Sequence, residues 1–241
     1  IASGAFLWLA LPVTPSRGAP ITWGNVSGNF TDGNNWVGLV APGTGDIATF
    51  GTVTVSPVVD AAASVAGLSF NATGAVTLSG GFPLTLGTSG ISNTSASGLK
   101  TVSNALVLGA AQAFNNGTVA GALLTVSGNV SNGGNLLTLN GTGTTGILSG
   151  VVSDGGGLTK SGTGTWTVSG TNTYTGNTTL NGGTLIAGND SAFGTGGTLS
   201  LLSGTLSAAA ARTLGNAVSL DGNTTIAGAG ALTFSNAVTL T

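Results

Sequence analysis

The chain lacks the side chains on which most enzyme active sites depend. It has no cysteine, histidine or methionine, and its acidic residues are six aspartates without a glutamate. Without cysteine there are no disulfide bonds, thiolate nucleophiles or cysteine metal ligands, and without histidine a Ser-His-Asp triad and the usual zinc sites are impossible. We therefore expect that the protein is not an enzyme, that it has no catalytic, metal-binding or cofactor-binding residue, and that it uses no cofactor.

The aspartates themselves have a simpler interpretation as turn residues. Three precede glycine, a pair typical of tight turns, and three stand alone between expected strands. The segment GTGD at 43–46 is similar to part of a glycine-rich calcium-binding repeat, but it is not repeated and supplies one carboxylate. The six residues are Asp32, Asp46, Asp60, Asp154, Asp190 and Asp221.

Charge is also scarce. Only ten of the 241 residues are charged, and the net charge is -2. Because the four basic residues Arg17, Lys100, Lys160 and Arg212 are scattered, no basic stripe is present to neutralise phosphates, so we expect no nucleic-acid partner. The surface must instead bind water through hydroxyl and amide groups. This composition favours a secreted location, either extracellular or at the bacterial cell surface.

Long apolar runs are absent. The longest stretch, AFLWLALPV at 5–13, is too short to span a membrane as a helix, which takes about twenty residues, so we expect no membrane span. We separate residues 1–20 as an apolar N-terminal segment with three interpretations: a cap on its own molecule, a strand exchanged into a neighbour, or a leader remnant. The chain begins without methionine, which suggests a piece of a longer protein. The candidate subunit-contact residues are Phe6, Leu7, Trp8, Leu9 and Leu11.

Glycine and short apolar residues are what the chain has in quantity. Glycine accounts for 44 residues, hydrophobic residues for 41%, and the mean hydropathy is +0.45. Three-residue alternations such as Val76-Thr77-Leu78 and Leu137-Thr138-Leu139 recur between glycine, asparagine and serine turns. This pattern predicts half-buried strands with no long helix.

A repeat of about twenty residues decides between all-β architectures. The segment 213–220 (TLGNAVSL) recurs as 233–240 (TFSNAVTL), and 101–108 (TVSNALVL) is a third copy. A β-sandwich would not return the same turn at a fixed interval. We therefore predict a right-handed parallel β-helix with about 20 residues per coil, a single domain over 21–241, and a rod of roughly eleven coils and about 50 Å. Asn104, Asn216 and Asn236 either hydrogen-bond between coils or are simple turn residues.

The segment 157–186 carries the most specific motif. In order, it contains LTKSG at 158–162, TVSG at 167–170, NTYTG at 172–176 and NGGTL at 181–185. This series resembles the autotransporter-associated β-strand repeat, or passenger-associated repeat, a family of secreted parallel β-helices. The match is specific over about thirty residues, and within the domain the best repeat match extends more loosely over 101–241. The aromatic residues of 21–50 are similar to the segment that precedes such repeats and are expected to cap the first coils.

Two functions from different classes follow. The first is a structural subunit that self-assembles, as a homo-polymer, into an extracellular or cell-surface fibre, because uncovered coil ends and few charged residues invite end-to-end addition. The alternative, which the resemblance implies, is a passenger or spacer segment that aids secretion and displays an adhesin. A third function, binding ice or flat glycans through threonine rows, needs outward pairs such as Thr165/Thr167 and Thr173/Thr175 on every coil, and most coils lack them.

Glycan attachment is a further expectation. The motif Asn-x-Ser/Thr recurs along the chain, and many copies are due to the abundance of these residues. Asn223 is singled out as the candidate glycosylation site because Asp221 lies two positions earlier, as in the extended bacterial acceptor motif. The motif occurs at Asn25, Asn29, Asn71, Asn93, Asn116, Asn129, Asn140, Asn177 and Asn223.

Overall fold

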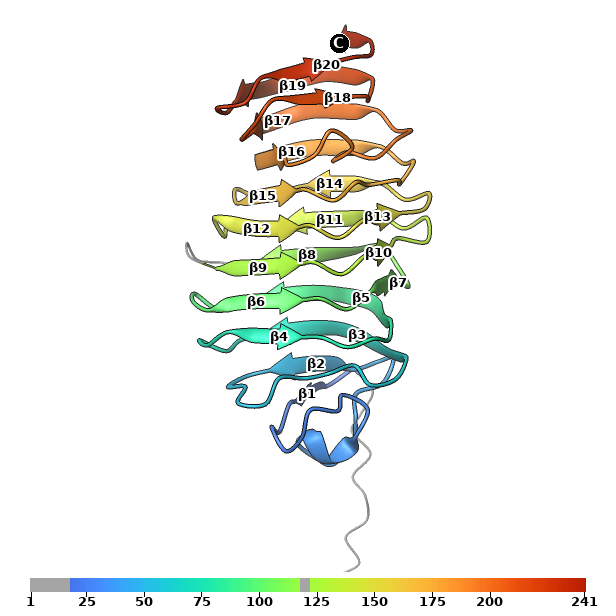
Figure 1. Cartoon of the computed structure of the whole chain (residues 1–241), viewed down its shortest axis with the longest axis vertical. Coiled ribbons are helices and arrows are strands. Elements are labelled where there is room, and N and C mark those ends of the chain that lie inside the picture. Colours follow the sequence, from blue (N-terminus) through green and yellow to red (C-terminus); the bar gives the residue numbers. More distant parts are fainter. Residues whose placement is uncertain (1–17, 118–121) are drawn as a thin grey trace, which may run out of the picture.

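The computed structural model describes residues 18–117 and 122–241. They form a parallel β-solenoid of about 9 turns with about 21 residues per turn and essentially no helix. Figure 1 shows the coils stacked in chain order along one axis, with η1 at the N-terminal end. The predicted all-β parallel architecture and its period are confirmed. The N-terminal segment 1–17, including the candidate contact residues Phe6 to Leu11, lies outside the described residues.

The strands are short, and only one short helix is present among the described residues. The helical element is the 3-10 turn η1 (Gly33–Asn35), which Asp32 caps by accepting a hydrogen bond from the backbone N–H of Asn34. The strands are β1 (Pro20–Thr22), β2 (Ile47–Phe50), β3 (Ala63–Phe70), β4 (Val76–Leu78), β5 (Leu84–Asn93), β6 (Leu99–Val102), β7 (Leu106–Leu108), β8 (Gln112–Asn116), β9 (Leu123–Val126), β10 (Val130–Ser131), β11 (Leu137–Asn140), β12 (Thr145–Leu148), β13 (Val152–Ser153), β14 (Leu158–Lys160), β15 (Thr165–Val168), β16 (Thr178–Ala187), β17 (Leu199–Ala208), β18 (Arg212–Leu214), β19 (Val218–Ala227), β20 (Leu232–Phe234) and β21 (Val238–Leu240).

Each coil has three faces. Face A runs through β1, β2, the second halves of β3 and β5, and then β8, β11 and β14 to the first halves of β16, β17 and β19. Face B runs through β4, β6, β9, β12 and β15 to the second halves of the same long strands. Face C contains the first halves of β3 and β5, then β7, β10 and β13. Every strand pairing between coils is parallel, so the hydrogen bonds run along the rod.

The register confirms the repeat seen in the sequence. Val218 pairs with Val238 and Thr213 pairs with Thr233, so each residue of the final repeat lies on its own copy twenty positions earlier. In the middle of the rod the spacing is longer, because Gln112 pairs with Leu137. These longer coils, and the use of the first residues to close the end of the rod, explain why the count is about 9 turns rather than the predicted eleven.

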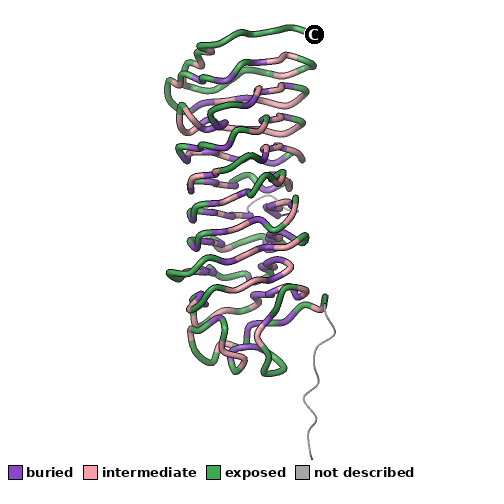
Figure 2. The backbone as a smooth tube through the Cα atoms, turned by 90° about the vertical axis from the view of Figure 1, so that its right-hand side faces the viewer, coloured by how far each residue is buried: buried purple, intermediate pink, exposed green. Residues whose placement is uncertain are grey.

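The core is one continuous column of inward side chains. Figure 2 shows buried residues alternating with partly buried and exposed ones along the coils. In β11, for example, Leu137 and Leu139 are buried, whereas the outward Thr138 is partly exposed. This is the period-two pattern that places apolar residues inside and hydroxyl groups outside.

An aromatic cluster closes the N-terminal end of the rod. The rings of Trp23 and Trp36 lie edge to face with centroids 5.0 Å apart, and Phe30 packs on Trp36 at the same distance. Phe50 stacks on Phe70 at 5.2 Å and carries the cluster into the first coils. All five rings are buried, which confirms the expected aromatic cap.

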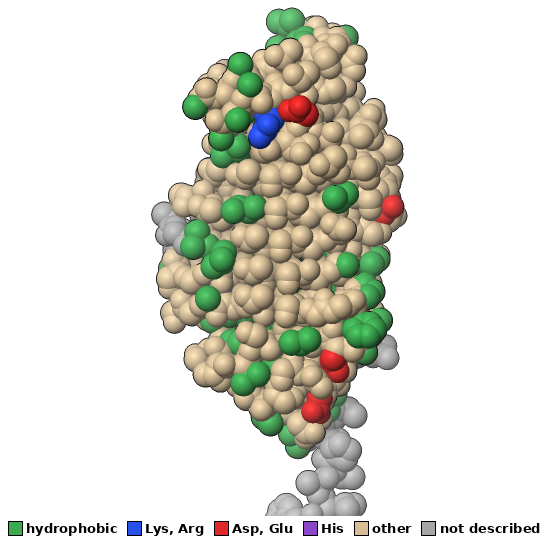
Figure 3. All heavy atoms as spheres, viewed as in Figure 1, with side chains coloured by type: hydrophobic (Ala, Val, Ile, Leu, Met, Phe, Trp, Pro, Cys, Tyr) green, Lys and Arg blue, Asp and Glu red, His purple; other side chains and the backbone are tan. Residues whose placement is uncertain are grey.

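The surface is polar but nearly uncharged. Figure 3 shows, on the face drawn, mostly uncharged polar side chains and backbone atoms, with hydrophobic side chains spread among them and a few scattered charged side chains. Within 18–117 and 122–241, no helix has the length and apolar character needed to cross a membrane.

Candidate functional site

A groove marks the corner between faces A and B. We use the name A/B corner for the described residues that follow the face A ends of β5, β8, β11 and β14, namely 94–98, 117, 141–144 and 161–164. At this corner lies a groove of about 350 Å³ that extends over four successive coils. Its lining residues are Ser92, Asn93, Thr94, Asn115, Gly117, Asn140, Gly141, Thr142 and Gly162.

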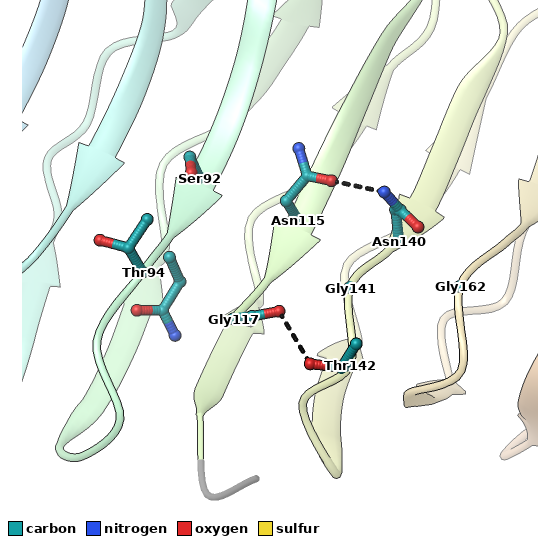
Figure 4. A pocket seen from close by; sticks show the side chains of 9 residues that line it. Ser92, Thr94, Asn115, Gly117, Asn140, Gly141, Thr142 and Gly162 are labelled. Atoms are coloured by element: carbon teal, nitrogen blue, oxygen red, sulfur yellow. Dashed lines mark hydrogen bonds between the residues drawn. The ribbon is translucent and has the colours of Figure 1, made fainter. Parts of the chain in front are cut away.

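The side chains along the groove follow the strand register. Ser92 pairs with Asn115 across β5 and β8, and Asn115 pairs with Asn140 across β8 and β11. The amide Nδ2 of Asn140 donates to Oδ1 of Asn115 at 2.8 Å, as Figure 4 shows. Thr142 crosses the next turn, where its Oγ1 lies 3.5 Å from the carbonyl oxygen of Gly117. The groove is therefore bordered by a row of hydroxyl and amide groups.

Glycines make the corner hollow. Gly141 and Gly162 have φ values of 107° and 66°, in the left-handed region that favours glycine. A Cβ at Gly162 would lie 2.6 Å from Oδ1 of Asn140 and equally close to the carbonyl oxygen of Gly141. A larger residue at either position would therefore strain the turn and fill the groove.

Buried side chains hold the groove in place from inside. Asn93 donates from Nδ2 to Oδ1 of Asn116 at 3.2 Å, and both side chains are buried. The indole Nε1 of Trp166 donates to the backbone carbonyl oxygen of Asn140 at 3.0 Å. The position of Asn140 is thus fixed by the strand ladder and by a buried indole.

Lys160 is buried behind the same corner. Its Nζ donates to three carbonyl oxygens, those of Ser161 at 2.5 Å, Gly162 at 3.0 Å and Gly182 at 3.1 Å. Burial lowers the pKa of Lys160 to about 8, although the three carbonyl acceptors favour the charged form. The ammonium group thus joins the turns of two coils without a carboxylate partner.

Lys100 repeats this arrangement nearer the N-terminal end. Its Nζ donates to the carbonyl oxygens of Gly74 at 2.7 Å, Ser97 at 2.8 Å and Gly98 at 2.8 Å. Burial also lowers the pKa of Lys100. The sequence analysis noted only that the basic residues are scattered and did not foresee that these two lysines are buried. The signal for Lys160 was its place in LTK, where alternation from Leu158 points it inward.

The segment with the specific motif uses its polar residues to join coils. Asn172 is buried, its Oδ1 accepts from the backbone N–H of Val152 at 2.7 Å, and its Nδ2 donates to the carbonyl oxygen of Ala192 at 2.7 Å. It therefore links one coil to both of its neighbours. Asn104, Asn216 and Asn236 also donate to carbonyl oxygens of the preceding coil. Those asparagines thus do bridge coils, through backbone acceptors rather than through each other.

The aspartates serve local structure. The carboxylate of Asp46 accepts from the backbone N–H of Gly43 at 2.9 Å, within the GTGD loop. Asp154 accepts from the hydroxyl of Ser131 at 2.5 Å and from the N–H of Gly133 at 3.2 Å, and these bonds hold the pKa of Asp154 below its usual value. In the part of the chain that the structure describes, no three metal-ligating side chains gather.

The candidate glycosylation site is accessible. Asn223 is exposed on β19. By contrast, Asn93 and Asn116 carry the same motif but are buried and hydrogen-bonded. The structure thus separates acceptor motifs that the sequence could not rank by accessibility.

The groove was not foreseen from the sequence. Its members lie 20 to 25 residues apart and are joined only by the coil register. One sequence signal could have pointed to the groove residues: a polar residue recurs directly after an inward apolar residue, as in Leu139-Asn140.

The three-faced parallel coils define the class of this protein as a parallel β-solenoid. Residues 158–187 match the family model of the passenger-associated-transport-repeat, in agreement with the resemblance drawn from the motif. This repeat is associated with autotransporter passenger domains, which implies a surface or secreted location. Searches of curated proteins and of solved structures found no match.

Proposed function

We propose that this chain is a passenger segment of an autotransporter-like surface protein, a non-enzymatic spacer rod that aids secretion and displays an adhesive portion. The observation that carries the proposal is the passenger-associated repeat at 158–187, set within a solenoid of uniform architecture. Its inward residues serve coil stacking, as the bonds of Asn172 to both neighbouring coils illustrate.

The architecture supports a role in secretion for a physical reason. Each coil pairs with the coil before it along parallel strands, so a new coil can fold on those already formed. A chain that leaves a membrane pore in an extended form can gain stability one coil at a time. The absence of cysteine means that no disulfide bond has to form during this process.

The distribution of polar groups supports a non-enzymatic role. The described aspartates bind backbone or hydroxyl groups of turns, as Asp46 and Asp154 do. The buried lysines bind carbonyl oxygens. These groups are engaged in structural bonds rather than positioned around a reactive centre.

Surface proteolysis of intact cells tests the proposal. Cells that encode the protein are treated with a protease, and the rod is detected with an antibody in the cells and the medium. We expect the chain to be surface-exposed or released. Detection only inside the cells, after lysis, would contradict the proposal.

A matched pair of variants tests the contribution of folding to export. Leu180→Asp places a charge in the buried core of the matched repeat, whereas Thr179→Asp changes its outward neighbour on the same strand. We expect Leu180→Asp to reduce the amount of rod at the surface by several-fold and Thr179→Asp to leave it near the wild-type level. Equal export of the two variants would exclude folding as a contribution to secretion.

The fibre subunit remains a second candidate because of one observation. The last described coil exposes Ile226 at 47%, Val238 at 44% and Leu240 at 79%. Among the described residues, β21 pairs with β19 alone, and an uncovered sheet edge accepts a further strand, whether from the same chain or from a second copy. The aromatic cluster at the opposite end argues against simple head-to-tail stacking, because among the described residues it covers the first coils. Electron microscopy of the full chain and of a chain without residues 1–20 tests this candidate: filaments that vanish on truncation favour it, and isolated rods in both samples exclude it.

A further inference from the structure

The groove at the A/B corner has the composition of a ligand site. Among the described residues, its lining consists of serine, asparagine, threonine and glycine. Within this part of the chain the lining has no ionic side chain for an anion or a cation and no apolar side chain for a lipid or an apolar peptide. The lining therefore suits an uncharged partner that is itself rich in hydroxyl groups.

Hydrogen-bonding capacity remains unused along the groove. The bond between the two asparagines occupies Oδ1 of Asn115 and Nδ2 of Asn140. Among the described residues, the remaining Nδ2 of Asn115 and Oδ1 of Asn140 have no partner, and neither does the hydroxyl of Ser92. Figure 4 shows the amide nitrogen of Asn115 turned away from Asn140. A free donor, a free acceptor and a hydroxyl thus lie side by side on adjacent strands.

We propose that this groove binds a neutral oligosaccharide. Sugar hydroxyls both donate and accept hydrogen bonds, and amide and hydroxyl side chains are the complementary groups. The strand spacing of about 4.8 Å places successive groups so that one short sugar chain, lying along the rod axis, contacts several coils. This inference goes beyond the passenger function, because binding is a property of the purified rod wherever the rod is located.

The fixed geometry of the groove favours binding. The register holds Ser92, Asn115 and Asn140 in one row, and Trp166 bonds to the Asn140 carbonyl from inside. Little ordering is therefore required when a ligand binds. None of the described lining residues is aromatic, so they offer sugar rings no stacking partner, and we expect a dissociation constant in the millimolar range, about −4 kcal/mol.

Nuclear magnetic resonance titration of the full chain tests the proposal. The probes are neutral trisaccharides of glucose, mannose, galactose or N-acetylglucosamine, with trialanine as an uncharged peptide probe. At least one sugar is expected to shift the side-chain amide signals of Asn115 and Asn140 in a saturable manner, and trialanine is not. A lack of saturable shifts with all four sugars, or shifts with trialanine alone, would overturn the proposal.

Variants localise the binding. Asn115→Ala and Ser92→Ala are each expected to weaken binding, by about tenfold for the asparagine, because a hydrogen-bonding group is lost from the row. Ser200→Ala is the matched control, since Ser200 lies outward on face A beyond the groove. Equal thermal midpoints would show that the variants fold. Wild-type affinity in both groove variants, or an equal loss in Ser200→Ala, would place the site elsewhere and overturn the assignment.

Discussion

Gly146 and Trp166 occupy the same inward position in successive coils, and the indole of Trp166 fills the space that a side chain at 146 would need. The two residues pair across β12 and β15. A Cβ at Gly146 would overlap the indole ring. The register thus matches the smallest residue with one of the largest, and the core stays filled without strain.

Gly146→Ala is expected to lower the free energy of unfolding by about 1–3 kcal/mol, because the buried indole must shift. Gly81→Ala is the control, since a Cβ there would contact nothing within 4 Å, and its effect should stay within about 0.5 kcal/mol. Urea unfolding measures both. In the double variant Gly146→Ala/Trp166→Leu the smaller side chain should relieve the clash, giving a favourable coupling between the two sites. Purely additive effects would contradict the packing argument.

Tyr174→Phe is expected to cost about 1 kcal/mol. The hydroxyl of Tyr174 lies 2.6 Å from Oγ1 of Thr178, and both side chains are buried. After the substitution Thr178 can still donate to the carbonyl oxygen of Phe193, at 3.4 Å. Thr178→Val should cost more, about 1–3 kcal/mol, because it leaves the buried tyrosine hydroxyl without a partner. Urea unfolding that ranks the two variants in the opposite order would contradict this account.

The stability of the rod should rise with pH above about 8. The pKa of Lys160 is lowered by burial to about 8, from an ordinary 10.5, so between these values the unfolded chain binds more protons than the folded chain. The lowered pKa of Lys100 acts in the same direction. Burial instead raises the pKa of Tyr174 above its ordinary 10.0, so above about pH 10 the unfolded chain loses that proton first and stability falls.

The rise and the fall together predict a pH at which the free energy of unfolding is greatest. Urea unfolding between pH 7 and 11 would locate this maximum. Lys160→Met should reduce the rise between about pH 8 and 10, and Tyr174→Phe should reduce the fall above about pH 10. A wild-type stability that decreases steadily from pH 8 would contradict the linkage assigned to the lysines.

Glycan attachment to the folded rod should favour Asn223 over Asn93 and Asn116. Asn223 is exposed, whereas the other two side chains are buried and bonded to each other. Peptide mapping by mass spectrometry of material from the source organism measures occupancy at each position, and Asn223→Gln controls the assignment. An occupied Asn116, or unmodified peptide at all three positions, would contradict the prediction.

Much of the fold was predictable because its signals are local. The alternation in Leu137-Thr138-Leu139 predicts which side chains point inward, and the twenty-residue return from Val218 to Val238 predicts the coil period; both were confirmed. The number of coils was not predicted correctly. The first aromatic residues form a cap and the middle coils are longer, and neither feature has a periodic pattern in the sequence. The roles of Lys100 and Lys160 were missed because charge alone suggests exposure.

By itself, the sequence determined a parallel β-solenoid with a nearly uncharged surface, a single continuous core and the passenger-associated repeat, because periodicity, composition and motif order are properties of the chain read in order. Only the tertiary structure decided what meets at the A/B corner. Ser92, Asn115 and Asn140 become neighbours through the register, and Lys160 meets the carbonyl of Gly182 because the next coil returns above it. Such contacts depend on the length of each turn, which sets the register between coils and which no local pattern specifies.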